Sequence, residues 1–358
     1  MENEIKNLSF KDQMIFVGID VHKKSWSVCI RDESMELRKF SQAPSPEILA
    51  RHLKSNYPDA SYRCVYESGF AGFSTQRELE KLGVSCMVVH AADVPTNAKE
   101  KQMKSDQRDC RKLAVTLSGN NLTPIYIPTN QEEEDRSIVR LRDRLVHDQT
   151  RCKLRIKSHL AFHGIAIPEK YEASSYWSKE FITWMEGIEF PSGSGKRTLL
   201  LLIESYKLAK QQVVKATLEI RTLSKEPRYI NNVKLLCGVP GIGPTNAMVF
   251  LTELGDIKRF KHLDNLCGYV GLTPKIHGSG DSIYVGKITN RGNASLREAL
   301  IESSWIAIRK DPALLMCYKE YCKKMPPNKA IIKIARKLLA RIRFVLLNQK
   351  AYVLGKVQ

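Results

Sequence analysis

The chain has 358 residues, with 57 Lys and Arg against 38 Asp and Glu, a formal net charge of +19 and 43% hydrophobic residues. This composition excludes a disordered tail protein, leaves room for two or three domains, and offers no apolar run near the ~20 residues of a membrane span. We expect no secretory signal in residues 1–16, and nine cysteines without CxxC pairs argue against a disulfide or zinc framework.

The first segments predict a mixed sheet. Residues 14–20, 25–31 and 36–41 are expected to be strands, because β-branched and aromatic residues gather there between charged turns. The following segments are predicted as helix, strand, helix and strand, at residues 46–53, 62–68, 74–82 and 84–90. Helices packed on such a sheet form an α/β domain, which we expect to end near residue 127.

Four carboxylates of this region are placed for chemistry. Asp20 follows VGI at the end of the first strand, and Glu67 ends the strand YRCVYE. Asp106 and Asp109 are three residues apart in KSDQRD, so both face the same side at the start of a helix. Any one of these acids alone is an ordinary surface group. Together they predict an oxygen-ligand cage for two Mg²⁺ ions.

Two long helical patterns follow. Residues 132–163 carry an imperfect apolar seam, with positions Ile138, Leu141, Leu145, Asp148 and Cys152. A cleaner heptad repeat runs through Leu199, Leu202, Tyr206, Ala209, Val213, Ala216, Ile220 and Leu223. This repeat is typical of a coiled coil, whose covering helix could belong to the same chain or to a partner. The stretch PSGSGKRT (191–198) lacks the first glycine of a Walker motif and is interpreted as a linker.

The C-terminal third is the most basic part of the chain. Residues 231–358 carry 21 Lys and Arg against 8 Asp and Glu, which makes nucleic acid the leading partner. Two short helices around Pro240–Gly243 resemble a helix-hairpin-helix, whose glycines either admit a phosphate or only permit the turn. Residues 329–347 predict an amphipathic helix, with Ile331, Ala335, Leu338 and Ile342 inward and Lys333, Arg336, Lys337 and Arg341 facing phosphates.

The combined pattern resembles the DEDD-type recombinases of the insertion-sequence-110 family, which includes relatives of the Piv DNA invertases and the bridge-RNA-guided recombinases. GIDVHK, VYESG, KSDQRD, GVPGIG and CGYVGLTPKIHGSG occur in the family's order and spacing. The resemblance implies an RNase H-like (RuvC-like) catalytic domain at 1–127 and a coiled-coil segment at 128–228. It also implies a mainly helical transposase domain at 229–358, with the helix-hairpin-helix and a catalytic serine.

The resemblance implies roles for five residues. It places a metal-binding catalytic tetrad on Asp20, Glu67, Asp106 and Asp109, and the nucleophile on Ser279. The glycine before Ser279 and the one after it would let a scissile phosphate approach. Ser282 stays an alternative nucleophile, and His277 is a less favoured candidate base. Ser295, which fits a capping box with Glu298, is predicted to be structural.

The function implied is that of a Mg²⁺-dependent recombinase or transposase, which cuts and rejoins donor and target DNA through a phosphoserine intermediate. A bridge RNA would guide it, and joining two duplexes implies a homo-oligomer, a dimer of dimers, with the heptads as candidate contacts. We expect a cytoplasmic bacterial protein, associated with the nucleoid when bound to DNA. Two alternatives stay open: an invertase or junction resolvase without RNA, and a nucleic-acid-binding protein without catalysis.

Overall fold

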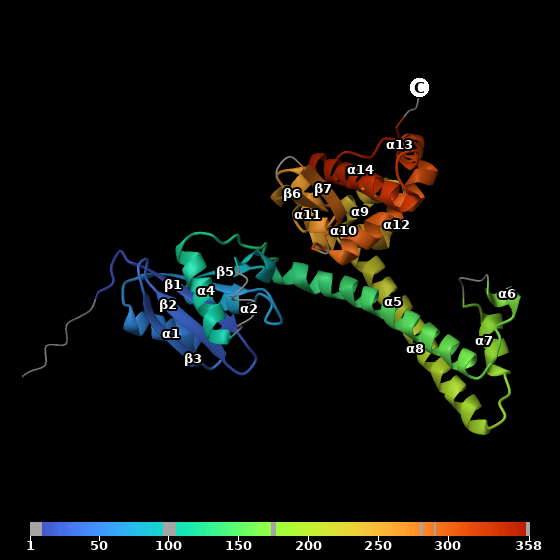
Figure 1. Ribbon diagram of the computed structural model, residues 1–358, viewed down its shortest axis with the longest axis horizontal. Helices are drawn as coiled ribbons and strands as arrows, with labels where there is room; N and C mark the ends of the chain where they lie inside the picture. The colour runs from blue at the N-terminus through green and yellow to red at the C-terminus, as the bar shows by residue number, and fades with distance from the viewer. Residues whose placement is uncertain (1–8, 96–104, 173–176, 280–281, 290, 356–358) are drawn as a thin grey trace, which may run out of the picture. The chain divides into compact units, whose positions relative to one another are not determined.

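The computed structural model describes residues 9–95, 105–172, 177–279, 282–289 and 291–355. The chain divides into two compact units, Met1–Ile127 and Pro128–Gln358 (Figure 1). The first unit holds a five-stranded sheet and the second is mostly helical. The predicted order of an α/β part followed by a mainly helical part is therefore confirmed. The further division of the helical part at residue 228 stays a prediction.

The sheet of the first unit is mixed, with the strand order β3-β2-β1-β4-β5. β1 pairs antiparallel with β2 and parallel with β4, and β5 continues the parallel side. Every predicted strand forms within one or two residues of its expected bounds. The strands are β1 (Met14–Val21), β2 (Trp26–Arg31), β3 (Glu36–Gln42), β4 (Ser61–Glu67) and β5 (Ser85–Val89).

Helices cover both faces of this sheet. Ile15, Val17 and Ile19 of β1 are fully buried in a core with residues of α1 (Pro46–Asn56) and α2 (Ser74–Lys81). Because strand side chains alternate, Phe16 and the neighbouring Val65 pack on the opposite face, against Leu113 and Leu117 of α4 (Asp106–Ser118). A short 3-10 helix, Ala91–Asp93, follows β5.

Gly18 allows α4 to lie directly on the sheet. A Cβ atom at this position would lie 2.0 Å from the carbonyl oxygen of Cys110 and 2.5 Å from the amide nitrogen of Ala114. No side chain larger than hydrogen fits there, so the backbones of β1 and α4 are in direct contact. This contact fixes the first turn of α4 near the end of β1.

The second unit begins with a long helical hairpin. α5 (Asn130–Phe162) and α8 (Gly193–Leu223) lie along each other, and α6 (Glu169–Glu172) and α7 (Lys179–Glu186) are at its far end (Figure 1). All eight heptad positions of α8 are buried or half-buried. Residues of α5 share their apolar clusters, so the covering helix of this seam belongs to the same chain.

Two sequence expectations for this hairpin are wrong in detail. On α5, Leu141 of the predicted seam is exposed, whereas Val139, Ile156 and Leu160 are buried. The predicted linker at 191–198 is helical from Gly193 onward, because α8 begins there. None of the helices in the described ranges is long and apolar enough to span a membrane.

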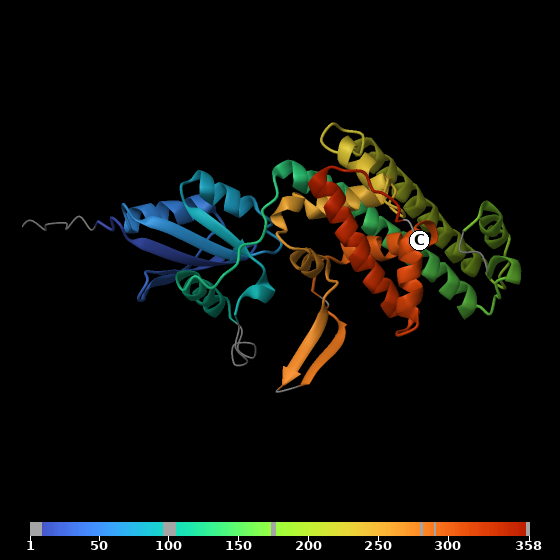
Figure 2. The same ribbon diagram turned by 90° about the horizontal axis from the view of Figure 1, so that it is seen from above.

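The remaining helices build one apolar core around α10 and α14. They are α9 (Ile230–Cys237), α10 (Pro244–Leu254), the 3-10 turn Ile257–Arg259, α11 (Leu263–Val270), α12 (Ala294–Lys310), α13 (Pro312–Cys322) and α14 (Pro327–Asn348). A β-hairpin, β6 (Pro274–Ser279) and β7 (Ser282–Ile288), projects from this helical body (Figure 2, orange).

A buried ion pair joins α5 to this core. Glu253 is 1% exposed and accepts two hydrogen bonds from Arg140, at 2.6 and 2.8 Å, and one from Asn293 at 2.6 Å. Burial works to raise the pKa of Glu253, but the hydrogen bonds and charge of Arg140 outweigh it and leave the pKa below its usual value. The carboxylate is therefore ionised and holds α5, α10 and the start of α12 together.

One glycine of the turn between α9 and α10 serves packing, and one arginine of α14 does not have its predicted role. Gly241 has φ of +88°, and a Cβ there would lie 2.2 Å from the carbonyl oxygen of Ser303, so this glycine serves packing on α12. On α14, Lys333 and Lys337 are exposed as predicted. Arg341 does not face phosphates, because it donates a 2.9 Å hydrogen bond to the buried Asp311.

Candidate active site

Asp20 and Glu67 lie next to each other at the carboxyl ends of two parallel strands. The register of β1 and β4 pairs the residues immediately before them. Each acid comes two residues after a position that faces α4, Gly18 on β1 and Val65 on β4, so alternation turns both toward α4. Both are half-buried at this edge of the sheet.

The first turn of α4 brings Asp106 and Asp109 to the same edge. The helix begins at Asp106, and its next turn contains Cys110, which contacts β1 at Gly18. Asp106 is exposed, whereas Asp109 is half-buried with one oxygen 3.9 Å from the Lys112 ammonium. The acids from two strands and one helix thus lie at the same edge of the sheet, although they are up to 89 positions apart in the chain. Their role as a metal cage stays a prediction.

A histidine that the sequence analysis did not assign to the site lies among them. Nε2 of His22 is 3.2 Å from Oδ2 of Asp20 and 3.7 Å from Oδ1 of Asp106, and one ligand atom from each residue lies within 4.8 Å of the others. Glu67 and Asp109 are not within this close set. The available signal was a histidine two residues beyond Asp20, but the spacing alone could not reveal its contact with Asp106.

The electrostatics of the site favour a bound cation. Burial raises the pKa of Asp20, and the carboxylates of Asp106 and Asp109 raise it further, while His22 opposes the shift. Concentrated negative charge of this kind is relieved by a divalent ion. Carboxylate oxygens are the ligands that Mg²⁺ prefers, and the chemistry of the donor set therefore fits a divalent cation.

The edge of this site carries an exposed aromatic ring. Phe70, three residues after Glu67, is 61% exposed, and the ammonium of Lys23 lies 5.9 Å from its ring centroid. Lys23 directly follows His22 in the chain. A cation beside an exposed ring is a combination found where single-stranded nucleic acid is bound.

Ser279 belongs to the second unit. It is the last residue of β6 and pairs with Ser282, the first residue of β7, at the tip of the projecting hairpin (Figure 2). Ser279 is thus placed at a strand end. The side chains of Ser279, Ser282 and His277 lie outside the described part of the structure, as do residues 280 and 281.

Ser295 is not a helix cap. Asn293 caps α12 by accepting a hydrogen bond from the backbone N–H of Leu296 at 3.1 Å. Ser295 instead donates a hydrogen bond to Asp143 of α5 at 3.0 Å. The predicted capping box is therefore wrong, because the cap lies two residues earlier.

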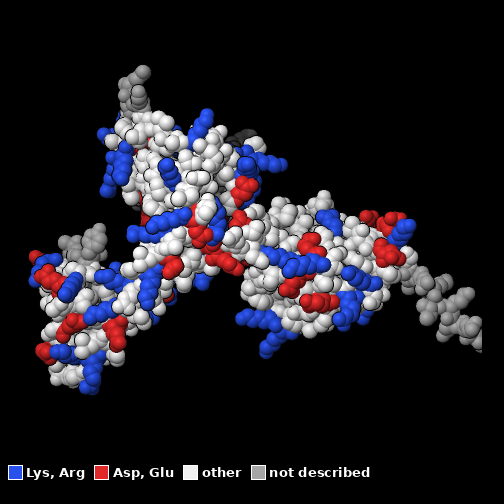
Figure 3. All heavy atoms as spheres, turned by 180° about the vertical axis from the view of Figure 1, so that it is seen from behind, with Lys and Arg blue, Asp and Glu red and all other residues white. Residues whose placement is uncertain are grey.

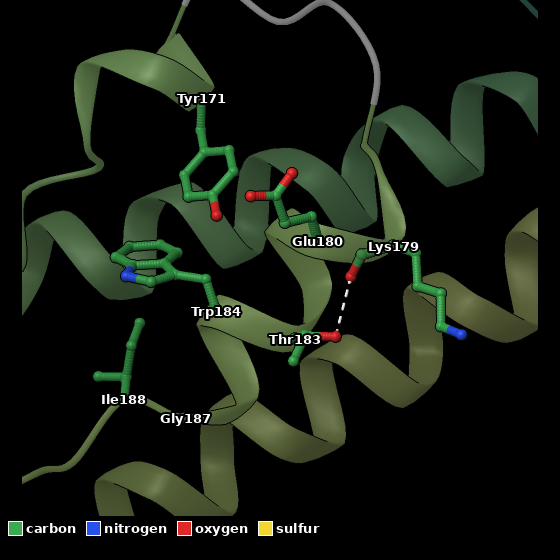
Figure 4. A pocket seen from close by; sticks show the side chains of 7 residues that line it. All are labelled: Tyr171, Lys179, Glu180, Thr183, Trp184, Gly187 and Ile188. Carbon is green, nitrogen blue, oxygen red and sulfur yellow. Dashed lines mark hydrogen bonds between the residues drawn. The ribbon is translucent and has the colours of Figure 1, made fainter.

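A wide hollow of about 720 Å³ lies far along the helical hairpin, at α6 and α7 (Figure 4). The side chains of Tyr171, Trp184 and Ile188 line it, and Thr183 donates a hydrogen bond to the carbonyl of Lys179 at 3.1 Å. None of the predicted site residues lines this hollow. Its size therefore does not make it the candidate active site.

Two family models of transposases match parts of this chain. A family model for DEDD-type IS110 transposases matches residues 17–164, a range that includes Asp20, Glu67, Asp106 and Asp109. A second model, described as the transposase IS116/IS110/IS902 family, matches residues 233–319, which include Ser279.

Several similar proteins carry the description of a transposase. A putative transposase of Sinorhizobium fredii is 26% identical over 81% of this chain and 71% of its own length. The transposase for insertion sequence element IS1533 of Leptospira borgpetersenii is 25% identical over 69% of this chain and 73% of its own. The transposase for IS1111A of Coxiella burnetii is 23% identical over 97% and 93% of the two chains. The chain therefore belongs to the IS110 family of insertion-sequence transposases.

Proposed function

We propose that this transposase cuts and rejoins DNA with Asp20, Glu67, Asp106 and Asp109 as ligands of two Mg²⁺ ions and Ser279 as the nucleophile. The observation that carries the proposal is that the four acids lie at one edge of the sheet. Within this set, ligand atoms of Asp20, Asp106 and the neighbouring His22 lie within 4.8 Å of one another. The match of separate transposase models to the parts of the chain that hold the acids and the serine supports the division of roles.

In the proposed reaction, one phosphodiester bond forms for each one that breaks. Metal ions held by the four acids would supply charge neutralisation at the phosphate. The Ser279 oxygen forms a bond to phosphorus while the bond from phosphorus to one sugar oxygen breaks. The serine gives up its proton, and the departing sugar oxygen takes one up. Attack by a hydroxyl of the other DNA strand reverses these changes, so joining needs no nucleotide cofactor.

DNA binding is supported by the surface of the second unit. Basic side chains spread over its C-terminal helices on the face seen in Figure 3. Lys333 and Lys337 of α14 are exposed, and such side chains bind phosphates without reading sequence. Because transposition joins two duplexes, we extend the proposal to a homo-oligomer. The Leu199–Leu223 seam is already covered by α5 of the same chain, so contacts between the subunits of this oligomer would use other residues.

Variants of the two kinds of residue test the chemistry. We expect Asp20→Asn and Ser279→Ala proteins to bind DNA at normal affinity and to lose strand exchange by about 10³-fold or more. With labelled DNA, the wild-type chain should form a covalent adduct that denaturing gels detect, and both variants should lack it. Ser282→Ala, a matched change on the same hairpin, should keep the adduct.

Two outcomes would change the proposed function. Full strand exchange by Ser279→Ala would remove the serine nucleophile and leave a metal-dependent resolvase that uses water. Full exchange by Asp20→Asn would remove the tetrad as the catalytic centre.

The proposal includes a bridge RNA as the guide for donor and target DNA. The excess of Lys and Arg in residues 231–358 suits two nucleic acids at once. Sequencing of RNA that copurifies with the protein, expressed with its native flanking DNA, tests this part. One enriched, structured RNA is expected. Only heterogeneous background RNA would favour an invertase whose DNA sites the protein itself reads.

A further inference from the structure

We infer that His22 is a direct ligand of a divalent cation together with Asp20 and Asp106, and that it makes this position prefer Mn²⁺ to Mg²⁺. The inference rests on the proposed metal site, which it deepens by adding a nitrogen ligand to the four acids. His22 is half-exposed, with 51% of its side chain accessible, so a cation from solution can reach the ring.

The distances fit a shared ion. In octahedral coordination with bonds of about 2.1 Å, neighbouring ligand atoms are about 3.0 Å apart and opposite ones about 4.2 Å apart. The His22 nitrogen lies 3.2 Å from the Asp20 oxygen and 3.7 Å from the Asp106 oxygen. Both separations fall between the two ideal values, and ligand atoms of all three residues lie within 4.8 Å of one another. Small side-chain rotations would therefore bring all three atoms to one ion.

The backbone holds His22 in this place. Val21 still pairs with Trp26 of β2, so His22 is the first residue of a short connection between two paired strands. Asp20 is two residues earlier, and Asp106 begins a helix that is seated on the same strand at Gly18. Two of the donors therefore lie on a strand and a helix, and His22 directly follows the last paired residue of β1, an arrangement that favours a preformed metal site.

The donor set predicts which metal is preferred. Mg²⁺ favours oxygen ligands and retains its waters, whereas imidazole suits the first-row transition metals. A site with two carboxylates and one imidazole should consequently gain affinity for Mn²⁺ from His22, and gain little for Mg²⁺. If His22 only donated a hydrogen bond to Asp20, both metals would respond to its removal in the same way.

Binding of Mn²⁺ to the full chain, freed of metal beforehand, tests the inference without an activity assay. Pulsed electron paramagnetic resonance should detect a directly coordinated imidazole nitrogen in the wild-type protein. His22→Ala should lose this signal and bind Mn²⁺ about tenfold more weakly, with less than a threefold change for Mg²⁺ measured by competition. His22→Asn, which offers an oxygen, should lose the nitrogen signal but recover part of the affinity.

His147→Ala is the matched control. His147 lies in a second cluster with Asp143 and Glu298, whose ligand atoms are also within 4.8 Å of one another. Loss of the nitrogen signal in His147→Ala, or its persistence in His22→Ala, would overturn the inference.

The Asp20→Asn variant distinguishes failure of the His22 inference from failure of the proposed metal site itself. If Asp20→Asn abolishes Mn²⁺ binding while His22→Ala keeps the nitrogen signal, the acid tetrad stands and only the His22 ligand falls. If Mn²⁺ binds normally to Asp20→Asn, the proposed metal site falls, and the His22 inference falls with it.

Discussion

Asp20 is placed where its ionised form is unfavourable. It is half-buried near Asp106 and Asp109, and its pKa is raised, chiefly by burial. A raised pKa means that the folded chain binds the proton more tightly than the unfolded chain. The contribution of Asp20 to stability is therefore present below the pKa of the unfolded chain and is lost as pH rises through the folded-state value. At neutral pH without metal, this residue weakens the fold.

We accordingly expect Asp20→Asn to stabilise the protein at pH 7 in the presence of a chelator, by roughly 1 kcal/mol. The difference should shrink toward pH 3, where the wild-type carboxyl is protonated. Urea denaturation at the two pH values measures both effects.

Asp32→Asn supplies the opposite case. The pKa of Asp32 is lowered, first by a hydrogen bond from the backbone N–H of Met35, so its removal should destabilise the fold at neutral pH. Destabilisation of the same sign at Asp20 would show that the fold does not disfavour the ionised form of this carboxyl.

Individual residues also mark the limit of sequence analysis. The strand ends made Asp20 and Glu67 visible, because a hydrophobic strand leads into each of them. His22 was missed because its second partner, Asp106, is 84 residues away in sequence and meets it only in the folded sheet. Arg341 was misjudged for a similar reason, since it binds Asp311, which lies at the junction of α12 and α13.

At the scale of elements, periodicity predicted the strands and the long helices well. The prediction failed at residues 193–198, where Gly and Ser suggested a linker but α8 already begins at Gly193. Gly195 is packed against Phe190, because a Cβ there would lie 2.5 Å from the ring. Contact with a side chain five residues earlier thus accompanies a helix start that glycine propensity disfavours, and single-residue propensities cannot anticipate this.

The turn between α9 and α10 offers a matched pair of glycines. Gly241 has a positive φ and no room for a methyl group beside Ser303, whereas Gly243 has open space around it and an ordinary φ of −100°. We expect Gly241→Ala to lower the free energy of unfolding by about 2 kcal/mol or more. Gly243→Ala should change it by less than about 0.5 kcal/mol.

Denaturation and DNA-binding measurements on the same two proteins separate the possible roles of this turn. Weaker DNA binding by a normally stable Gly243→Ala protein would indicate that a phosphate approaches the start of α10. Equal stability of both variants would contradict the packing role of Gly241.

For the molecule as a whole, charge says more about partners than about fold. The chain carries a net charge of +19, and an excess of 13 basic residues lies in residues 231–358. A field of this sign draws nucleic acid to the protein over several ångströms and weakens with salt. Composition therefore predicted a polyanionic partner, whereas the chemistry done on that partner had to come from the four acids and the family motifs.

The salt dependence of DNA binding tests whether α14 contributes to that field through direct contacts. Replacing both Lys333 and Lys337 by Gln should reduce the slope of log affinity against log salt by about 2, since each phosphate contact contributes about 0.9. The loss of affinity should be equal for donor, target and unrelated DNA, because phosphate contacts carry no sequence information. Lys323→Gln is the control, since its ammonium already binds Glu320 at 2.6 Å. An unchanged slope in the double variant would place the DNA on another face of the second unit.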